Sequence, residues 1–301
     1  MTLATAIAAY VSLNQSIGMR FQVDAGLLRA FQRHAGDIDL AAVTPEVVVA
    51  FLQPRALVTS TWLMKHRALR RLFQYAITRG LVTSSPVPTA IPRMPETFVP
   101  HIYTDEELRR LLAGVDKNQA RVRCTISART FRAALLLLYG AGLRLGELLA
   151  LRREDVDLDC GLILIRESKF YKSRQLPIGP RLTQVLAEVA PASRPSMTAF
   201  FVNGRGQPIP LHTIWWNFNE LRTAVGVRGR LHDLRHTFAV HRLLAWYREG
   251  ADVQRHLPHL STYLGHARIA CTQRYLTMIP ALLEQASQRF EAYRCGEAHH
   301  A

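Results

Sequence analysis

Residues 231–239 read Leu-His-Asp-Leu-Arg-His-Thr-Phe-Ala, a run in which imidazole, carboxylate and guanidinium groups alternate with apolar side chains. The sequence from residue 211 onward has helical spacing, so this run is expected on a helix. His232 and Arg235 are three residues apart, which places both side chains on one helical face. A purely structural helix does not need these polar groups. The stretch therefore predicts a helix that packs along one side and carries chemistry on the other.

Other short segments also hold reactive side chains that packing alone does not require. One follows an apolar run expected to form a buried helix, and reads Gly-Leu-Arg-Leu-Gly-Glu-Leu over 142–148. Another reads Tyr-Leu-Gly-His over 263–266, with a tyrosine nine residues after the histidine. A third is a polar, basic connection between two predicted strands at 162–165 and 176–178. The reactive side chains of these segments are Arg144, His266, Tyr275, Lys169 and Lys172.

Together these groups suit the cleavage of a phosphodiester without a metal. That reaction needs a nucleophile, cationic donors on the non-bridging oxygens and an acid for the leaving oxygen. Arginine matches phosphate oxygens bidentately and stays charged. A tyrosine hydroxyl can form a covalent phosphodiester that stores the bond energy for rejoining. A lysine can serve as the acid, because two nearby arginines lower its pKa.

The four motifs, in this order, resemble the tyrosine recombinase (phage integrase) family over residues 102–295. The resemblance rests on Gly142–Glu147, on the run at 231–239, on the Leu-Gly-His at 264–266 and on the placement of Tyr275. It implies a catalytic domain preceded by a helical core-binding domain. The expected fold is mainly α with a small antiparallel sheet, an α+β arrangement with a third strand at 200–202.

The resemblance also implies a role for each reactive side chain. Arg144 and Arg235 hold the scissile phosphate, and Tyr275 is the nucleophile that forms a 3′-phosphotyrosyl bond. The remaining implied roles are these: His232 contacts the phosphate or accepts the tyrosine proton, His266 contacts the transition state, Lys169 protonates the departing 5′ oxygen, and Glu147 supports the site.

Three alternatives stay open within the site. Lys172 competes with Lys169, because the family commonly has glycine beside the lysine and this chain has Phe170 and Tyr171 there. Tyr263 is the rival nucleophile, although its apolar neighbours favour packing. The third is a zinc hydrolase, because 232–236 read H-D-x-x-H, which is close to the zinc-protease pattern. No third metal ligand stands out, so no metal site is predicted.

The chain is expected to form two domains joined by a proline-rich linker. Residues 84–101 contain five of the 15 prolines, a density that excludes a helix or an inner strand. We therefore expect a helical DNA-binding domain over 1–83, the linker over 84–101 and the catalytic domain over 102–301. The last helix before the linker combines an apolar stripe with a basic face that can meet phosphates.

Charge points to a polyanionic partner. Lys and Arg number 38 against 23 Asp and Glu, which gives a net charge of +15 and favours double-stranded DNA. The side chains predicted to contact DNA are Lys65, Arg67, Arg70, Arg71, Lys172 and Arg174. On charge an anionic membrane surface ranks second to nucleic acid, and we expect DNA and no membrane as the partner. No stretch approaches 18 uncharged apolar residues, so no membrane-spanning helix is expected. The four cysteines form no C-x-x-C pair, and we expect a cytoplasmic protein.

The expected function is that of a site-specific DNA recombinase or integrase that needs no metal, ATP or other cofactor. By resemblance, a homo-tetramer acts on paired sites, with related recombinase subunits as further candidates. A helix expected over 280–293 could dock on its own domain or on a neighbouring protomer. A mobile-element integrase and a chromosome-dimer resolvase both fit. The alternatives are relaxation of DNA in the manner of a type IB topoisomerase, and a DNA-binding partner subunit with reduced catalysis.

Overall fold

The computed structural model describes residues 1–19, 21–52, 59–92, 99–122, 124–166, 173–190, 198–277 and 287. The chain divides into two compact units, Met1–Phe98 and Val99–Ala301. Lys169 and Lys172 lie outside the described residues, as does the helix expected over 280–293 apart from residue 287.

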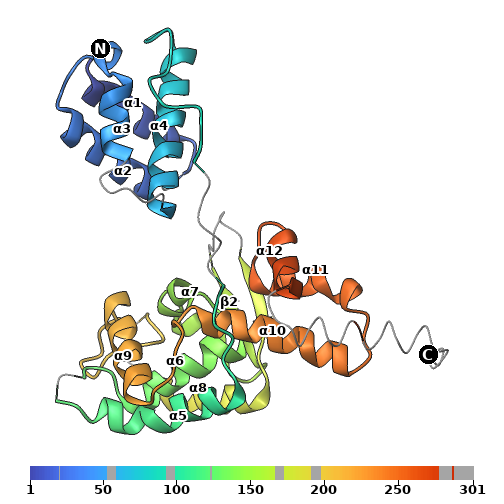
Figure 1. The fold of residues 1–301 in the computed structure, drawn as a ribbon. Coiled ribbons are helices and arrows are strands. Elements are labelled where there is room, and N and C mark those ends of the chain that lie inside the picture. The colour runs from blue at the N-terminus through green and yellow to red at the C-terminus, as the bar shows by residue number, and fades with distance from the viewer. Residues whose placement is uncertain are drawn as a thin grey trace. The chain divides into compact units, whose positions relative to one another are not determined.

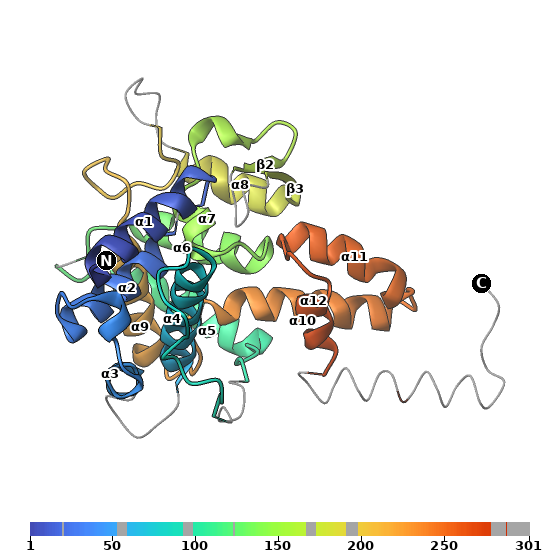
Figure 2. The ribbon, with the colours of Figure 1, turned by 90° about the horizontal axis from the view of Figure 1, so that it is seen from above.

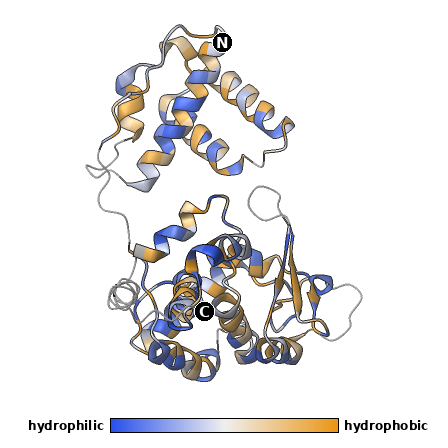
Figure 3. Ribbon diagram, turned by 90° about the vertical axis from the view of Figure 1, so that its right-hand side faces the viewer, coloured by the Kyte–Doolittle hydropathy of each residue, from blue (hydrophilic) through white to orange (hydrophobic). Residues whose placement is uncertain are grey.

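The first unit is helical (Figure 1). Its elements are α1 (Leu3–Ser16), α2 (Gln22–Ala35), the 3-10 helix η1 (Leu40–Ala42), α3 (Pro45–Leu52) and α4 (Ser60–Thr78). The side chain of Thr59 caps α4 by accepting a hydrogen bond from the backbone N–H of Trp62. The predicted stripe of α4 is buried, with Leu72, Phe73 and Ala76 fully covered. Figure 3 shows the amphipathic pattern, in which apolar and polar residues alternate around each helix of this unit.

Part of the proline-rich segment packs on this first unit. Val87 is buried in its core. His66 of α4 is also buried, and its Nε2 lies 2.7 Å from the carbonyl oxygen of Pro88. The residues at 84–88 are therefore held against α4 by one hydrogen bond and one apolar contact.

The second unit contains the remaining helices and the sheet (Figures 1 and 2). Its helices are α5 (Asp105–Gln119), α6 (Ala128–Gly140), α7 (Leu145–Leu149), η2 (Arg153–Asp155), α8 (Pro180–Val189), α9 (Leu211–Ala224), α10 (Asp233–Arg248), α11 (Val253–Leu264), α12 (Ala270–Gln273) and η3 (Arg274–Thr277). Thr104 and Glu107 form the reciprocal capping box that opens α5. The apolar run before the Arg144 motif lies in α6, which is buried as expected along Phe131, Leu135 and Leu138.

The sheet has three antiparallel strands in the order β1 (Val156–Asp157), β2 (Leu162–Ile165) and β3 (Arg174–Pro177). Ile163 pairs with Leu176 at its centre, and both are fully buried. The mainly α fold with a small antiparallel sheet is thus confirmed.

The prediction of a strand at 200–202 was wrong. Phe200 and Phe201 are buried core residues. Their neighbours make only single bridges, Arg152 with Ala199 and Val202 with Pro208. Each bridge is isolated, so no ladder forms at 200–202. The apolar run reflects burial here and not pairing.

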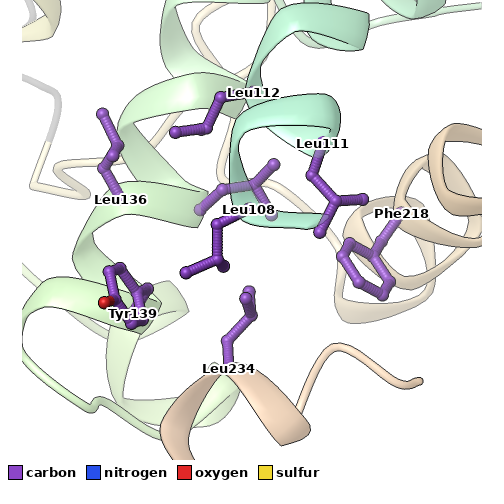
Figure 4. A pocket seen from close by; sticks show the side chains of 8 residues that line it. Leu108, Leu111, Leu112, Leu136, Tyr139, Phe218 and Leu234 are labelled. Carbon is purple, nitrogen blue, oxygen red and sulfur yellow. The ribbon is translucent and has the colours of Figure 1, made fainter. Parts of the chain in front are cut away.

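An apolar pocket of about 70 Å³ lies among α5, α6, α9 and α10 (Figure 4). Leucines and one phenylalanine line it, together with Tyr139, whose hydroxyl shares a hydrogen bond with His241. No residue predicted to be catalytic lines this pocket, so the chemistry is located elsewhere in the unit. Among the described residues, no helix is both long enough and apolar enough to cross a membrane.

Candidate active site

A buried ion-pair network fixes the first arginine of the site. Arg144 lies at the start of α7, and its backbone N–H and its Nη1 both donate to the carboxylate of Glu147, at 3.0 and 2.6 Å. Its Nη2 donates to the carbonyl oxygen of Gly265 at 2.9 Å. Arg174 of β3 donates from Nη1 and Nη2 to the two oxygens of Glu147 at 3.1 and 2.9 Å. The carboxylate is therefore shared by two guanidinium groups that come from different elements.

Glu147 stays ionised in this network. Burial raises the pKa of its carboxyl, but the hydrogen bonds and charges of Arg174 and Arg144 outweigh burial and leave it below the usual value. Glu147 is only 8% exposed, whereas Arg144 is 29% exposed. Glu147 and the carbonyl oxygen of Gly265 thus fix the Arg144 guanidinium on its protein side, while the group stays accessible to solvent.

Arg235 lies more deeply than Arg144. It is 2% exposed, and its Nη1 and Nη2 donate to the carbonyl oxygens of Gly142 and Leu264, each at 2.5 Å. Burial and then the charge of Arg144 lower the pKa of Arg235 to about 10, which still leaves it charged at neutral pH. These carbonyls fix the plane of the guanidinium and use two of its five N–H groups.

Two glycines allow these close approaches. Gly142 has φ +59°, and a Cβ there would lie 2.5 Å from Phe238. Gly265 has φ +66°, and a Cβ there would lie 2.7 Å from Nη1 of Arg174. Both positions need a left-handed backbone and have no room for a side chain, which explains glycine in each motif.

Three histidines belong to this region, and two of them, His236 and His266, contact the nucleophile candidate. His232 precedes α10 and is exposed, and its ring meets that of His236 edge to face with centroids 4.9 Å apart. His266 shares a 2.7 Å hydrogen bond with Thr272 through Nδ1. Burial and neighbouring positive charge lower the pKa of His236 and of His266 to about 4 in each case. The surrounding protein and Arg235 also lower the pKa of His232, although its side chain reaches solvent.

Tyr275 lies in η3 against His236 and His266. It is 3% exposed, and its Oη is 3.0 Å from Nδ1 of His236. Its ring stacks on His266 with centroids 6.2 Å apart. Burial raises the pKa of the phenol, and the charges of Arg235 and Arg144 oppose that rise. The hydroxyl therefore lies within the electrostatic field of both arginines.

Tyr263, the rival nucleophile, has a different environment. Its ring stacks on Phe238 and its hydroxyl donates to the carbonyl oxygen of Pro177 at 3.2 Å. It thus packs between α10 and β3 as its apolar neighbours predicted. Five of the six predicted catalytic residues lie in one part of the second unit, and the sixth, Lys169, falls outside the described residues together with Lys172.

The sequence motifs did not single out two residues of this site, Arg174 and His236, for the contacts they make. Arg174 was grouped with the DNA-binding residues, yet its side chain is only 10% exposed and also donates to the carbonyl oxygen of Tyr263 at 2.8 Å. From the sequence, His236 is expected to pack on its helix or to support the site from behind, with the metal site as the less favoured alternative. Its spacing of four residues from His232 was the one available signal.

The basic side chains of α4 fall into two groups, those that are exposed and those that are bonded within the protein. Arg67 and Arg70 are exposed. Arg71 pairs with Asp24 at 2.9 Å. Lys65 donates to the carbonyl oxygen of Phe51 at 2.9 Å, and its ammonium lies 4.1 Å from the centre of that ring. Arg67 and Arg70 are therefore the side chains of this face with the best access to a ligand.

The described residues do not bring together the ligands that the metal alternative needs. No group of three His, Cys, Asp or Glu side chains suited to holding a metal occurs in the described part of the chain. The Nδ1 of His236 is also engaged by Tyr275.

Comparison with known proteins identifies the family. Residues 102–280 match the model of the phage integrase family. The chain is 32% identical over 305 residues to y4rB of Sinorhizobium fredii, a protein assigned as an integrase/recombinase, covering 96% of this chain and 97% of the relative. It is also 33% identical over 201 residues to tyrosine recombinase XerA of Thermococcus kodakarensis, covering 66% of this chain and 65% of that one.

Solved structures share the fold. An integrase of the Tn1549 transposon, in complex with a circular intermediate DNA, matches with a TM-score of 0.72 at 17% identity, over 97% of this chain and 99% of that one. A lambda integrase dimer bound to a core site matches with a TM-score of 0.67 at 18% identity, over 93% and 97%. These comparisons do not favour the topoisomerase or regulator alternatives. The chain belongs to the phage integrase family, the tyrosine recombinases that its four motifs resemble.

Proposed function

We propose that this protein is a site-specific DNA recombinase that breaks and rejoins duplex DNA through a covalent 3′-phosphotyrosyl bond to Tyr275. The observation that carries the proposal is the convergence of the two arginines on consecutive carbonyls. Arg235 donates to Leu264 and Arg144 to Gly265, and the next residue, His266, stacks on Tyr275. One turn of chain thus brings together two cations and a tyrosine.

This arrangement suits a phosphodiester. Arg144 and Arg235 have N–H groups beyond those that the carbonyls use, and these can bind the non-bridging oxygens of the scissile phosphate. Charge that develops on these oxygens in the transition state is stabilised by donors already held in place. Arg235 and Tyr275 are both buried in the free protein, so the approach of a phosphate has to open the site further.

The phosphotyrosyl bond keeps the energy of the broken phosphodiester, so the proposed reaction uses neither a metal nor a nucleotide. The departing 5′ oxygen needs a proton. By the family resemblance we assign that role to Lys169, with Lys172 as the second candidate. His266 and His232 would then serve as hydrogen-bonding groups around the phosphate.

Both units are proposed to bind double-stranded DNA. In the first unit Arg67 and Arg70 offer exposed guanidinium groups from one face of α4. Recombination joins two duplexes, so we propose a tetramer on paired sites, formed by this chain or with related subunits. We propose that it acts on chromosomal or mobile-element DNA in the cytoplasm.

A suicide oligonucleotide that loses its 5′ fragment on cleavage tests the nucleophile. The wild-type protein should accumulate a covalent adduct, and Tyr275→Phe should abolish the adduct while DNA binding persists. Tyr263→Phe is the matched control, because that tyrosine has a packed ring and a bonded hydroxyl but no contact with the histidines. Adducts that survive in Tyr275→Phe and vanish in Tyr263→Phe would reverse the assignment.

A further inference from the structure

His236 contacts the reacting oxygen of the proposed nucleophile. Its Nδ1 lies 3.0 Å from Oη of Tyr275, and the two ring centroids are 5.6 Å apart. The family resemblance gave the tyrosine proton, if any histidine took it, to His232. Among the described residues His232 makes no hydrogen bond to Tyr275. The geometry thus separates the two histidines of the H-D-x-x-H run.

The hydrogen bond runs from the phenol to the imidazole. Burial, followed by the charge of His232, lowers the pKa of His236 to about 4, so the ring is neutral at pH 7. Burial raises the pKa of Tyr275, so the phenol keeps its proton. Its buried hydroxyl has no other hydrogen-bond partner within the described residues. The phenol hydrogen therefore points at Nδ1, and the imidazole carries its own proton on Nε2.

The titratable and charged groups that face His236 come from several elements. They are His232, Asp233 and Arg235 at the start of α10, Arg230 in the loop before it, His266 after α11, and Tyr275 of η3. Burial is the largest cause of the lowered pKa of His236, and the positive charges of Arg235 and Arg230 add to it while the site is empty. A bound phosphate adds negative charge that offsets them, which favours an imidazolium ion as the reaction proceeds.

We propose that His236 is a catalytic residue, the general base that takes the proton of Tyr275 during cleavage and returns it during rejoining. The inference rests on the proposed function. In cleavage the Oη–H bond breaks and an N–H bond forms on Nδ1, while Oη bonds to phosphorus. The bond from phosphorus to the 5′ oxygen breaks, and that oxygen takes its proton from the general acid, proposed above as Lys169 with Lys172 as the second candidate. Rejoining reverses each transfer.

The same helix supplies a matched control. His241 of α10 is also half-buried, and its Nδ1 lies 2.9 Å from the hydroxyl of Tyr139. Burial lowers its pKa as well. This pair borders the apolar pocket and has no part in the phosphate site. His241→Asn therefore reports the cost of losing a buried histidine–tyrosine bond without touching the reaction.

The test is His236→Asn, because an asparagine oxygen can take the place of Nδ1 as a hydrogen-bond acceptor but cannot hold the proton. Adduct formation on a suicide substrate should fall by roughly 10²-fold or more at pH 7, while His241→Asn stays near the wild-type rate. The wild-type rate should be nearly flat from pH 6 to 8, since His236 is already deprotonated there. The variant rate should rise about tenfold per pH unit, because the phenol must ionise unaided.

A second substrate separates the base from the acid. A 5′-bridging phosphorothiolate has a sulfur leaving group that departs without a proton, so it rescues the loss of a general acid. It should not rescue His236→Asn. Rescue by this substrate, or adduct formation as fast as or faster than the wild type, would overturn the inference. If wild-type protein forms no adduct through Tyr275, the proposed function itself fails. If His236→Asn does not fold, imidazole added to His236→Ala gives the same test: restored cleavage supports the base and no restoration opposes it.

Discussion

Replacing Arg174 with glutamine should destabilise the second unit strongly, although a sequence comparison would rate the change as mild. The guanidinium donates to both oxygens of Glu147, at 3.1 and 2.9 Å, and to the carbonyl oxygen of Tyr263 at 2.8 Å. The side chains of the ion pair are 10% and 8% exposed. The substitution removes three hydrogen bonds and leaves a buried carboxylate with one cation in place of two.

The expected size follows from burial. Removing one partner of a buried ion pair costs about 3–5 kcal/mol, and Arg144 still neutralises part of the charge, so we expect about 3 kcal/mol. With a urea slope of about 3 kcal/mol per molar, the unfolding midpoint falls by about 1 M. The matched control is Arg109→Gln. Arg109 pairs with Glu106 at 3.1 Å, but both side chains are about two-thirds exposed or more, at 71% and 67%, so its loss should cost less than about 0.5 kcal/mol.

Tryptophan fluorescence during urea denaturation measures this change. The chain has four tryptophans, and a Trp62→Phe background leaves only those of the second unit. The difference between Arg174→Gln and its background should also depend on pH. The folded-state pKa of Glu147 is held below its usual value of 4.5, so the stabilisation is present above that pH and is lost as pH falls through the folded pKa. The difference should therefore shrink as the pH falls below 4.5.

Two results would refute this reasoning. The first is an Arg174→Gln midpoint no lower than that of Arg109→Gln. The second concerns DNA, because a phosphate contact at Arg174 would lower the salt slope of DNA binding by about one, whereas a residue that acts inside the protein leaves that slope unchanged. A slope that falls by one would restore the original prediction that Arg174 binds DNA.

Two other substitutions test the site and the first unit. Gly265→Ala should cost at least about 2 kcal/mol and reduce cleavage, because φ is +66° and a Cβ would displace the neighbouring guanidinium; Gly250→Ala, with φ +74° and open space, should show only the smaller backbone cost in the same urea assay. Arg67→Gln and Arg70→Gln should each reduce the salt slope of DNA binding by about one in titrations at several salt concentrations. Lys65→Gln should lower the slope less, since its ammonium is held by Phe51, and equal effects at all three would contradict this division.

The sequence predicted much of the fold because local patterns governed it. The capping box at Thr104 and the apolar stripe of α4 depend on neighbours within four residues, and both occur where expected. The prediction of a strand at 200–202 was wrong because it, too, rested on a local pattern alone. The apolar pattern of this run cannot distinguish a strand from a loop packed into the core, since the outcome depends on which partners the run meets in the folded chain.

The sequence also predicted the residues of the site better than the contacts between them. The resemblance to the tyrosine recombinases implied that Arg144, Arg235, His266 and Tyr275 act together, and the structure brings them to one place. It could not predict which histidine meets the hydroxyl of Tyr275, because a step of four residues on α10 points both rings toward the same region.

By itself, the sequence determined the family, the mainly α fold and the residue types that can carry the reaction, because each follows from short motifs and their order. Tertiary structure alone decided how the charged groups divide their roles. Arg174 lies in β3 and Glu147 in α7, and their contact exists only after the sheet packs beside that helix. Likewise His236 and Tyr275 are 39 residues apart, and only the packing of η3 on α10 places a buried neutral imidazole against the phenol. Burial and distance set the charge state of a side chain, and both are properties of the folded chain.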